Sequence, residues 1–288
     1  MLKKYPFAAY VELSKPRILM LVLVTATIGY YAGGHGFNDL WKLLMLLLGT
    51  ALTSGGSGAL NHYIERDVDQ KMHRTRNRPL PSGNVSPLGV LNYGIVLVLT
   101  GTLLLVWQVN LLTAFLALLT AFLYVLVYTP MKRITWLNTL IGAIPGALPP
   151  MGGWAASTGD LGPGAWVLFA ILFIWQQPHF YAIAWMFRDD YARGGFKMLP
   201  VVEPDGRSTF RQILFFSTIL IPVSLVPTML GITGNFYAVG AFALGVWMLA
   251  TGIVLTRSAS YADARRVLKT SVIYLPLLLG LFVMDGSF

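Results

Sequence analysis

The chain has 288 residues, of which 56% are hydrophobic and only 11% are charged, and its formal net charge is +9. Soluble domains carry roughly 25% charged residues, so this composition excludes an ordinary soluble domain and indicates an integral membrane protein. The absence of cysteine excludes disulfides, thiolate metal sites and cysteine nucleophiles. We expect no nucleic-acid partner, because topology together with anionic lipids or phosphates accounts for the positive charge.

Hydrophobic runs recur along the whole sequence. A membrane helix needs about 20 predominantly apolar residues, and we predict nine of them in one domain covering residues 1–288, an all-α polytopic fold. Lys3, Lys4, Lys15 and Arg17 precede the first run, which lacks a clear cleavage site and is expected to be a retained anchor. The predicted spans are 18–34, 40–62, 88–108, 111–128, 135–156, 164–186, 211–231, 235–256 and 269–285.

Basic residues fall almost entirely on one side of this layout. The N-terminus and the loops after spans 2, 4, 6 and 8 contain all but one of the 21 Lys and Arg residues, Lys42 being the exception. The positive-inside rule therefore predicts a cytoplasmic N-terminus and an external C-terminus in the cell (inner) membrane. Two long cytoplasmic loops, at about 63–87 and 187–210, also hold most of the 12 acidic residues.

The first polar motif lies where the second span ends. Asn61, Glu65 and Asp69 recur every four residues, so a helix places them on one face. Mg²⁺ binds through one or two carboxylates and completes its shell with water and phosphate oxygens, so this face suits a metal-bridged diphosphate, with nearby Lys and Arg residues on the remaining oxygens. The alternative is a solvated, salt-bridged helix end.

A second polar motif follows the sixth span. Asp189 and Asp190 are adjacent, so only one can face a site on a helix. We favour Asp190 as the metal-side acid, while a salt bridge to a neighbouring arginine is the structural alternative. His179 follows Pro178 inside the span, as a hydrogen-bonded structural residue or as an active-site base or substrate contact.

Longer motifs carry a family resemblance over nearly the whole chain. Asn61-x-x-x-Glu65-x-x-x-Asp69 resembles the first acidic motif of the UbiA superfamily of intramembrane prenyltransferases. Residues 65–80, the Tyr128-Thr129-Pro130-x-Lys132-Arg133 segment, Trp175-Gln176-x-Pro178-His179-Phe180 and Met198-Leu199-Pro200 resemble the protoheme IX farnesyltransferase family within it. Glu65 stands where Asp is usual. Met186 stands where quinone-type members carry the first acid of the second motif.

This resemblance implies nine helices around a central cavity and a farnesyl transfer from farnesyl diphosphate to haem B, with Mg²⁺ as cofactor. It implies Mg²⁺ on Asn61, Glu65, Asp69 and Asp190 through the diphosphate, and His179 as a further catalytic residue. It also implies a downstream partner that receives the product, a haem A synthase or a haem-copper oxidase. The implied substrate-binding residues are Arg66, Lys71, Arg74, Arg78, Tyr128, Lys132, Arg133 and Trp175. The aromatic residues Tyr128, Trp175, Phe180, Tyr181 and Trp185 are expected to line the cavity or to pack in the core.

Three rival functions fit parts of the pattern. A quinone, chlorophyll or other aromatic prenyltransferase shares the first acidic motif, but the segments around His179 and Met198 argue against it. A secondary transporter would place its acids near the bilayer midplane, whereas these acids lie at the cytoplasmic ends of spans and among bases. Nothing in the sequence favours a non-catalytic oxidase assembly factor.

Overall fold

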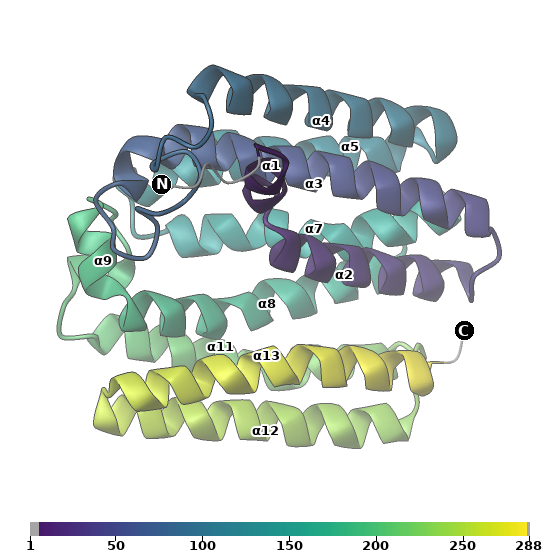
Figure 1. Cartoon of the computed structure of the whole chain (residues 1–288). Coiled ribbons are helices and arrows are strands. Elements are labelled where there is room, and N and C mark those ends of the chain that lie inside the picture. The colour runs from purple at the N-terminus through teal and green to yellow at the C-terminus, as the bar shows by residue number, and fades with distance from the viewer. Residues whose placement is uncertain (1–5, 287–288) are drawn as a thin grey trace.

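The structure, a computed structural model, describes residues 6–286, so that Lys3 and Lys4 of the predicted anchor lie outside it. Over this range the chain forms helices and no β-strand, and the long helices lie side by side in one bundle (Figure 1). The helices are α1 (Pro6–Leu13), α2 (Pro16–Gly34), α3 (Leu40–Asp69), α4 (Pro87–Gln108), α5 (Leu111–Phe122), the π-helix η1 (Leu123–Tyr128), α6 (Thr129–Ile134), α7 (Asn138–Thr158), α8 (Pro163–Met186), α9 (Arg188–Arg193), α10 (Leu199–Val202), α11 (Arg207–Met229), α12 (Asn235–Ser258) and α13 (Tyr261–Met284).

The long helices begin at residues that suit helix starts. The side chains of Asp39, Ser86, Asn110 and Ser260 accept a hydrogen bond from the backbone N–H three residues on, which satisfies an otherwise free donor of α3, α4, α5 and α13. Helices α2, α4 and α8 also begin with a proline, whose fixed φ suits the first helical position.

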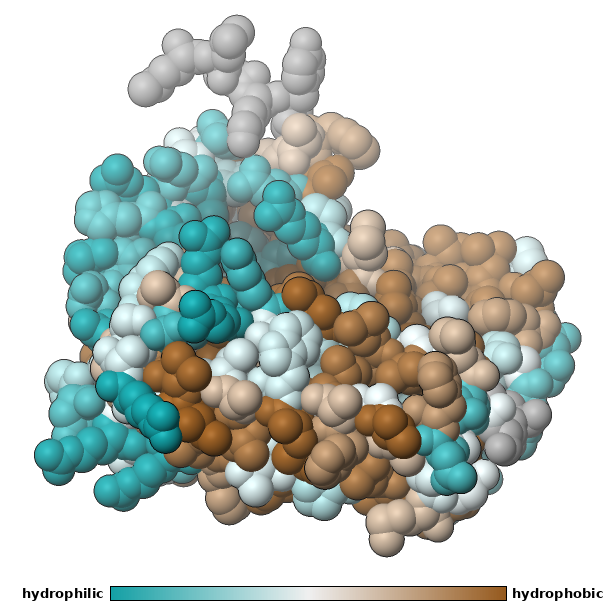
Figure 2. Space-filling model, turned by 90° about the horizontal axis from the view of Figure 1, so that it is seen from below, coloured by the Kyte–Doolittle hydropathy of each residue, from teal (hydrophilic) through white to brown (hydrophobic). Residues whose placement is uncertain are grey.

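Eight helical segments of the described chain are long and apolar enough to cross a membrane: α2, α3, α4, the continuous rod α5–η1–α6, α8, α11, α12 and α13. Helix α7 has 21 residues and corresponds to the fifth predicted span, 135–156. Its three prolines and many small residues make it less apolar than the other eight segments. Figure 2 shows hydrophilic residues gathered at one end of the bundle and hydrophobic residues over much of the remaining flank. The all-α membrane fold is therefore confirmed.

The predicted element bounds differ from the structure mainly at the polar end. Helix α3 continues to Asp69, so the predicted loop 63–87 begins only after the first motif. The predicted loop 187–210 contains α9 and α10. Both segments lie at the same end of the bundle, on the left in Figure 1, and the C-terminal end of α13 lies at the opposite end.

Glycines allow the helices around the centre to approach closely. A Cβ on Gly153 of α7 would lie 1.9 Å from the carbonyl oxygen of Ala26 in α2, and one on Gly29 of α2 would lie 2.0 Å from that of Pro150 in α7. Gly56 of α3 and Gly94 of α4 contact each other's backbone in the same way. Small residues are the usual means of close helix packing in membranes, and here they bring α2 and α3 to the cavity wall.

Candidate active site

A small polar cavity lies at the hydrophilic end of the bundle, beside the last two turns of α3. It encloses about 80 Å³. Helix α3 places Asn61, Glu65 and Asp69 on the same side, as their spacing predicts, while the side chain of Asp67 is 72% exposed. The cavity is lined by Lys15, Asn61, Glu65, Asp69, Met72, Arg74, Thr75, Arg78, Tyr128, Lys132, Tyr191, Phe196 and Met198.

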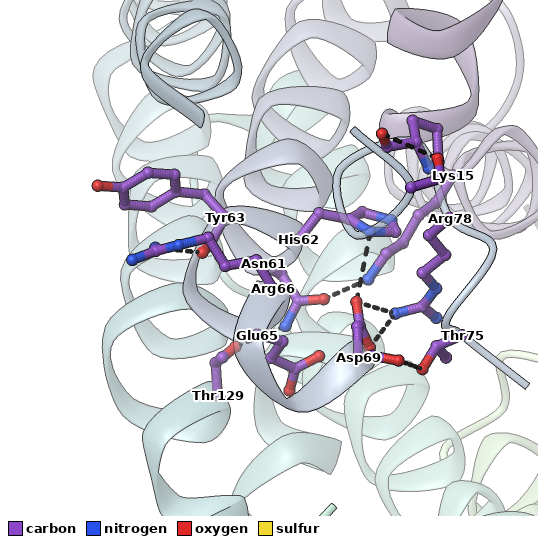
Figure 3. A network of polar contacts seen from close by, with 12 residues as sticks. Lys15, Asn61, His62, Tyr63, Glu65, Arg66, Asp69, Thr75, Arg78 and Thr129 are labelled. Atoms are coloured by element: carbon purple, nitrogen blue, oxygen red, sulfur yellow. Dashed lines mark hydrogen bonds and ion pairs between the residues drawn. The ribbon is translucent and has the colours of Figure 1, made fainter. Parts of the chain in front are cut away.

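Asn61 is held at both ends of its amide group. Its Nδ2 donates to Thr129 Oγ1 at 2.9 Å, and its Oδ1 accepts from Lys15 Nζ at 2.5 Å (Figure 3). Thr129 in turn donates to the carbonyl oxygen of Tyr124 at 2.8 Å, a contact made within the turn that joins η1 to α6. Because both groups of the amide are bonded, its oxygen has a fixed direction beside the cavity.

Each carboxylate of the motif is paired with a different cation. Glu65 accepts from Lys132 Nζ at 2.7 Å, and Arg78 Nη1 lies 2.9 Å from both carboxylate oxygens of Asp69. Thr75 donates to the carbonyl oxygen of Asp69 at 2.9 Å, which fixes the end of the helix. All three motif residues are buried, so the charges of Glu65 and Asp69 are stable only while their cationic partners remain.

These side chains suit a magnesium ion that is shared with a phosphate ligand. In the described chain, no three acidic, histidine or cysteine side chains converge to hold a metal by themselves. One amide oxygen and two carboxylates leave coordination positions open, and Mg²⁺ usually fills such positions with water and substrate phosphates. The four cations of the cavity, Lys15, Arg74, Arg78 and Lys132, outnumber its two acids, so the site as a whole favours an anion.

Asp190 anchors the loop that follows α3. Its two carboxylate oxygens accept from the backbone N–H groups of His73 and Arg74 at 3.0 and 3.1 Å, and Arg193 pairs with it. Burial would raise the pKa of Asp190, but these hydrogen bonds outweigh burial and lower it. Asp190 does not line the polar cavity. The geometry therefore favours anchoring over its expected role at the metal, which stays a prediction.

A second and larger cavity adjoins the polar one and runs into the bundle. It encloses about 510 Å³, within the range of roughly 300–1,000 Å³ that is typical of small-molecule sites. Its wall is mostly apolar and comes from α2, α3, α5, η1, α7 and α8. Three residues, Lys15, Tyr128 and Lys132, line both cavities. A ligand with a phosphorylated head and an apolar tail would fit both compartments.

The sequence matches the UbiA prenyltransferase family over residues 22–275. The chain belongs to this family. It is 50% identical over 285 residues to a protoheme IX farnesyltransferase of Solibacter usitatus (96% of this chain, 98% of the relative) and 49% identical over 276 residues to one of Salinibacter ruber (96% and 98%). Relatives at this identity place it with the protoheme IX farnesyltransferases inside the UbiA family.

Solved structures share the fold. A digeranylgeranylglyceryl phosphate synthase structure superposes with a TM-score of 0.83 at 17% identity, covering 97% of this chain and 98% of the other. A UbiA homologue from Archaeoglobus fulgidus, solved with DMAPP and Mg²⁺, superposes with a TM-score of 0.68 at 16% identity, covering 95% and 99%. The protein is thus an integral membrane prenyltransferase of the UbiA fold.

The structure brings most of the expected substrate-binding residues together. Arg74, Arg78, Tyr128 and Lys132 line the polar cavity, and Trp175 lines the apolar one with Phe180. Tyr181 and Trp185, which we also expected to be candidates for the cavity wall, pack instead in the core of α8, α11, α12 and α13. Their side chains lie on the side of α8 that faces the core, and hydrophobicity alone does not distinguish the two sides because most residues of α8 are apolar.

Three expected phosphate-binding residues lie away from both cavities. Arg66 donates to the carbonyl oxygen of Tyr63 and stacks on its ring, 4.6 Å from the centroid, on the opposite side of α3 from Asp69 (Figure 3). Lys71 and Arg133 are exposed. In each case the helix or turn directs the side chain away from the two cavities. These residues line neither cavity, and their contact with phosphate stays a prediction.

Two further residues belong to the site. Lys15 precedes the first span and was counted only toward topology, yet its ammonium reaches Asn61. Tyr124 lies in η1, whose wider turn places it, with Tyr128, on the cavity wall. The sequence held one signal for Lys15, its position directly before the proline that begins the first span. Nothing in the sequence indicated a π-helix.

Proposed function

We propose that this protein transfers the farnesyl group of farnesyl diphosphate to a vinyl group of haem B, with addition of water, and so forms haem O and diphosphate. The observation that carries this proposal is the 50% identity, over nearly full length, to a relative named protoheme IX farnesyltransferase. The geometry supports it independently, because a cation-rich cavity opens into an apolar one of about 510 Å³.

The polar cavity binds the diphosphate head in this proposal. Asn61, Glu65 and Asp69 would hold a Mg²⁺ ion, which would supply positive charge to neutralise the bound diphosphate. Arg78 and Lys132 already lie within hydrogen-bond distance of the two carboxylates, so they are placed to bind phosphate oxygens as well. Such preorganised charge stabilises the leaving diphosphate as the allylic C–O bond breaks, and this is usually the largest catalytic effect.

The apolar cavity accepts the farnesyl chain and the porphyrin edge. It excludes water from the farnesyl cation until the haem vinyl group adds to that cation. Tyr124, Tyr128 and Trp175 line the wall, and aromatic rings attract cations. Water then adds to the porphyrin-side cation and a proton is released.

His179 is placed to accept that proton or to contact the haem iron. Ser271 donates its only hydrogen to the carbonyl oxygen of Leu268 at 2.7 Å, so Nδ1 of His179 donates to Ser271 Oγ, also at 2.7 Å. Nε2 is then unprotonated, with its lone pair available. The imidazole stacks on Trp175, with 5.1 Å between the ring centroids, and lines the apolar cavity. We propose it as a base or an iron contact.

The remaining assignments belong to the same proposal. The catalytic unit is one membrane domain over residues 1–288, with a cytoplasmic N-terminus and an external C-terminus in the inner membrane. Haem O would pass from it to a haem A synthase or a haem-copper oxidase.

A direct assay tests this function. The purified protein in detergent is incubated with haem B, farnesyl diphosphate and Mg²⁺, and the products are read by mass spectrometry. We expect a Mg²⁺-dependent product heavier than haem B by one farnesyl group plus water, with release of stoichiometric diphosphate. Farnesyl transfer to a quinone or phenol, and none to haem, would assign the chain to a different acceptor within the UbiA family.

A further inference from the structure

The side-chain amide of Gln176 has an unused hydrogen-bond acceptor at the apolar cavity. Its Nε2 donates to the carbonyl oxygens of Ala143 at 3.2 Å and Leu172 at 3.1 Å. These bonds fix the orientation of the amide, because a flipped amide would place its oxygen against two carbonyl oxygens. Among the residues that the structure describes, no N–H or O–H group donates to Oε1. Gln176 nevertheless lies inside the bundle, where it is only 5% exposed and lines the apolar cavity.

A glycine of α7 makes room for that oxygen. A Cβ on Gly146 would lie 2.0 Å from Oε1 of Gln176, so a larger residue there would displace the amide. Gly146 lines the apolar cavity as well. Helix α7 therefore supplies the acceptor for the amide nitrogen, at Ala143, and the space for the amide oxygen three residues further along.

His179 presents a second acceptor on the same face of α8. It lies three residues after Gln176, and side chains with this spacing are neighbours on a helix. Its Nδ1 donates to Ser271 of α13, which leaves the lone pair of Nε2 for a ligand. Trp175 strengthens this contact between the helices, since its Nε1 donates to the carbonyl oxygen of Ser271 at 2.8 Å. Helix α8 thus presents two acceptors whose own donor groups are already used.

Two acceptors side by side favour a ligand that donates two hydrogen bonds. The farnesyl chain has no O–H or N–H group, and an ionised haem propionate only accepts hydrogen bonds. A water molecule can donate one hydrogen to each acceptor, and a lone pair of its oxygen then remains free. Buried waters are typically held by two to four polar groups in this way, and the surrounding wall is mostly apolar.

We propose that Gln176 and His179 hold the water molecule that adds to the porphyrin-side cation, with Gln176 as a positioning residue for that water. The inference rests on the proposed function for its substrates. When the terminal carbon of the haem vinyl group bonds to the farnesyl cation, the positive charge moves to the carbon next to the porphyrin. The water oxygen donates an electron pair to that carbon, and one water proton passes to Nε2 of His179. The product therefore carries a hydroxyl group.

The same cation has a second outcome when no water is positioned. His179 can then take a proton from the former terminal vinyl carbon, and the electron pair of that C–H bond forms a C=C double bond next to the porphyrin. The product is a farnesylated haem that is lighter than haem O by one water. The ratio of this dehydrated product to haem O therefore reports on water placement separately from farnesyl transfer.

The test measures this ratio by mass spectrometry. The full-length protein in detergent is supplied with haem B, farnesyl diphosphate and Mg²⁺. We expect Gln176→Met to raise the ratio about 2- to 10-fold over wild type, the range for the loss of one neutral hydrogen bond. Gly146→Ala should raise it too, because the new Cβ displaces the amide oxygen. Haem O taken through the same work-up without enzyme gives the background of dehydration.

Gln177→Met is the matched control. Gln177 is fully buried at the next position of α8, its Nε2 donates to the carbonyl oxygen of Phe173 at 3.2 Å, and it lines neither cavity. The substitution removes an identical amide without touching the water site, so the product ratio should equal that of wild type. If Gln176 only packed α8 against α7, its loss would lower both products together and leave their ratio unchanged.

The outcomes separate the two proposals. If wild type forms haem O and Gln176→Met keeps the wild-type ratio, or if Gln177→Met raises the ratio as much, Gln176 does not position the water and the proposed function stands. If wild type attaches no farnesyl group to haem, the proposed function fails and this inference fails with it. Should Gln176→Met not elute as a folded protein, Gly146→Ala decides, and a wild-type ratio there would overturn the inference.

Discussion

The three residues of the first motif are each held by one basic side chain from a different part of the chain. Lys15 comes from the α1–α2 corner, Lys132 from α6 and Arg78 from the loop after α3. Before a ligand binds, these cations hold the motif oxygens in place and offset the charge of the two carboxylates. With Mg²⁺ and a diphosphate present, the same cations can bind phosphate, so the site needs little rearrangement.

Asp69→Asn should lower kcat for farnesyl transfer at least 100-fold, the usual scale for losing a group that stabilises transition-state charge. The variant should still insert in the membrane, because the isosteric amide keeps the helix end intact. Asp67→Asn is the matched control, since that side chain is 72% exposed on the other side of α3, and it should keep near-normal turnover. Full activity of Asp69→Asn in the haem assay would remove this residue from the site.

Asp190→Asn should loosen the loop after α3. It removes the ion pair with Arg193 and weakens the bonds to the N–H groups of His73 and Arg74, so backbone hydrogen exchange over residues 70–78 should rise about tenfold. Asp189→Asn, whose side chain is 84% exposed, should leave that exchange unchanged. Equal exchange in both variants would show that Asp190 does not anchor the loop.

The pH dependence of hydrogen exchange in the loop after α3 follows from the direction in which the pKa of Asp190 is shifted. The folded pKa of Asp190 lies below its ordinary value of 3.8, so its stabilisation is present above that value and is lost as the pH falls through the folded pKa. After correction for intrinsic exchange, protection of residues 70–78 should therefore be constant from pH 5 to 8. A loss of protection within that range would contradict this assignment of charge.

At the scale of elements, the apolar cavity depends on how closely α7 approaches α2. Gly29 and Gly153 let the two backbones touch, and the prolines of α7 interrupt its hydrogen bonding within the bundle, where neighbouring helices can compensate. The π-helix η1 then turns Tyr124 and Tyr128 to the cavity.

Gly153→Ala should destabilise the protein by about 1–3 kcal/mol, the usual effect of overpacking, because its Cβ would meet the backbone oxygen of Ala26 at 1.9 Å. The neighbouring Gly152→Ala meets nothing within 4 Å and should be neutral or mildly stabilising, since alanine favours helix. Apparent unfolding temperatures in one detergent compare the two variants. An equal effect of both would mean that the α2–α7 contact does not limit stability.

At the scale of the whole molecule, the polar site lies at one end of a bundle whose flank is hydrophobic (Figure 2). The loop after α3 and helix α9 share that end, and the loop between α7 and α8 lies at the other. This layout places the polar cavity at the hydrophilic end of the bundle and the apolar cavity among the membrane helices.

Because the chain has no cysteine, single introduced cysteines can report on its orientation. Asn77→Cys in the loop after α3 should react with a membrane-impermeant maleimide only after the cells are opened, whereas Asp160→Cys, between α7 and α8, should react in intact cells. Both positions are exposed. The reverse pattern would invert the proposed topology.

The residues of the first motif could be predicted because an i, i+4, i+8 pattern depends only on helix periodicity, and α3 continues through Asp69. The same periodicity does not show whether the side chains of Arg66, Lys71 and Arg133 face the cavities. Whether a basic residue beside a motif turns inward depends on helix rotation and on the path of the following turn, and neither is encoded in local charge.

Composition and hydrophobic length determined the membrane class and the order of the apolar helices, because these depend on transfer free energies that are summed locally along the chain. Only the tertiary structure decided that Lys15 meets Asn61, that Asp190 anchors the loop at His73 and Arg74, and that Tyr124 faces the cavity. Those contacts join residues 46 and 117 positions apart in the chain, or depend on an irregular helix, so they form only when the whole bundle is packed.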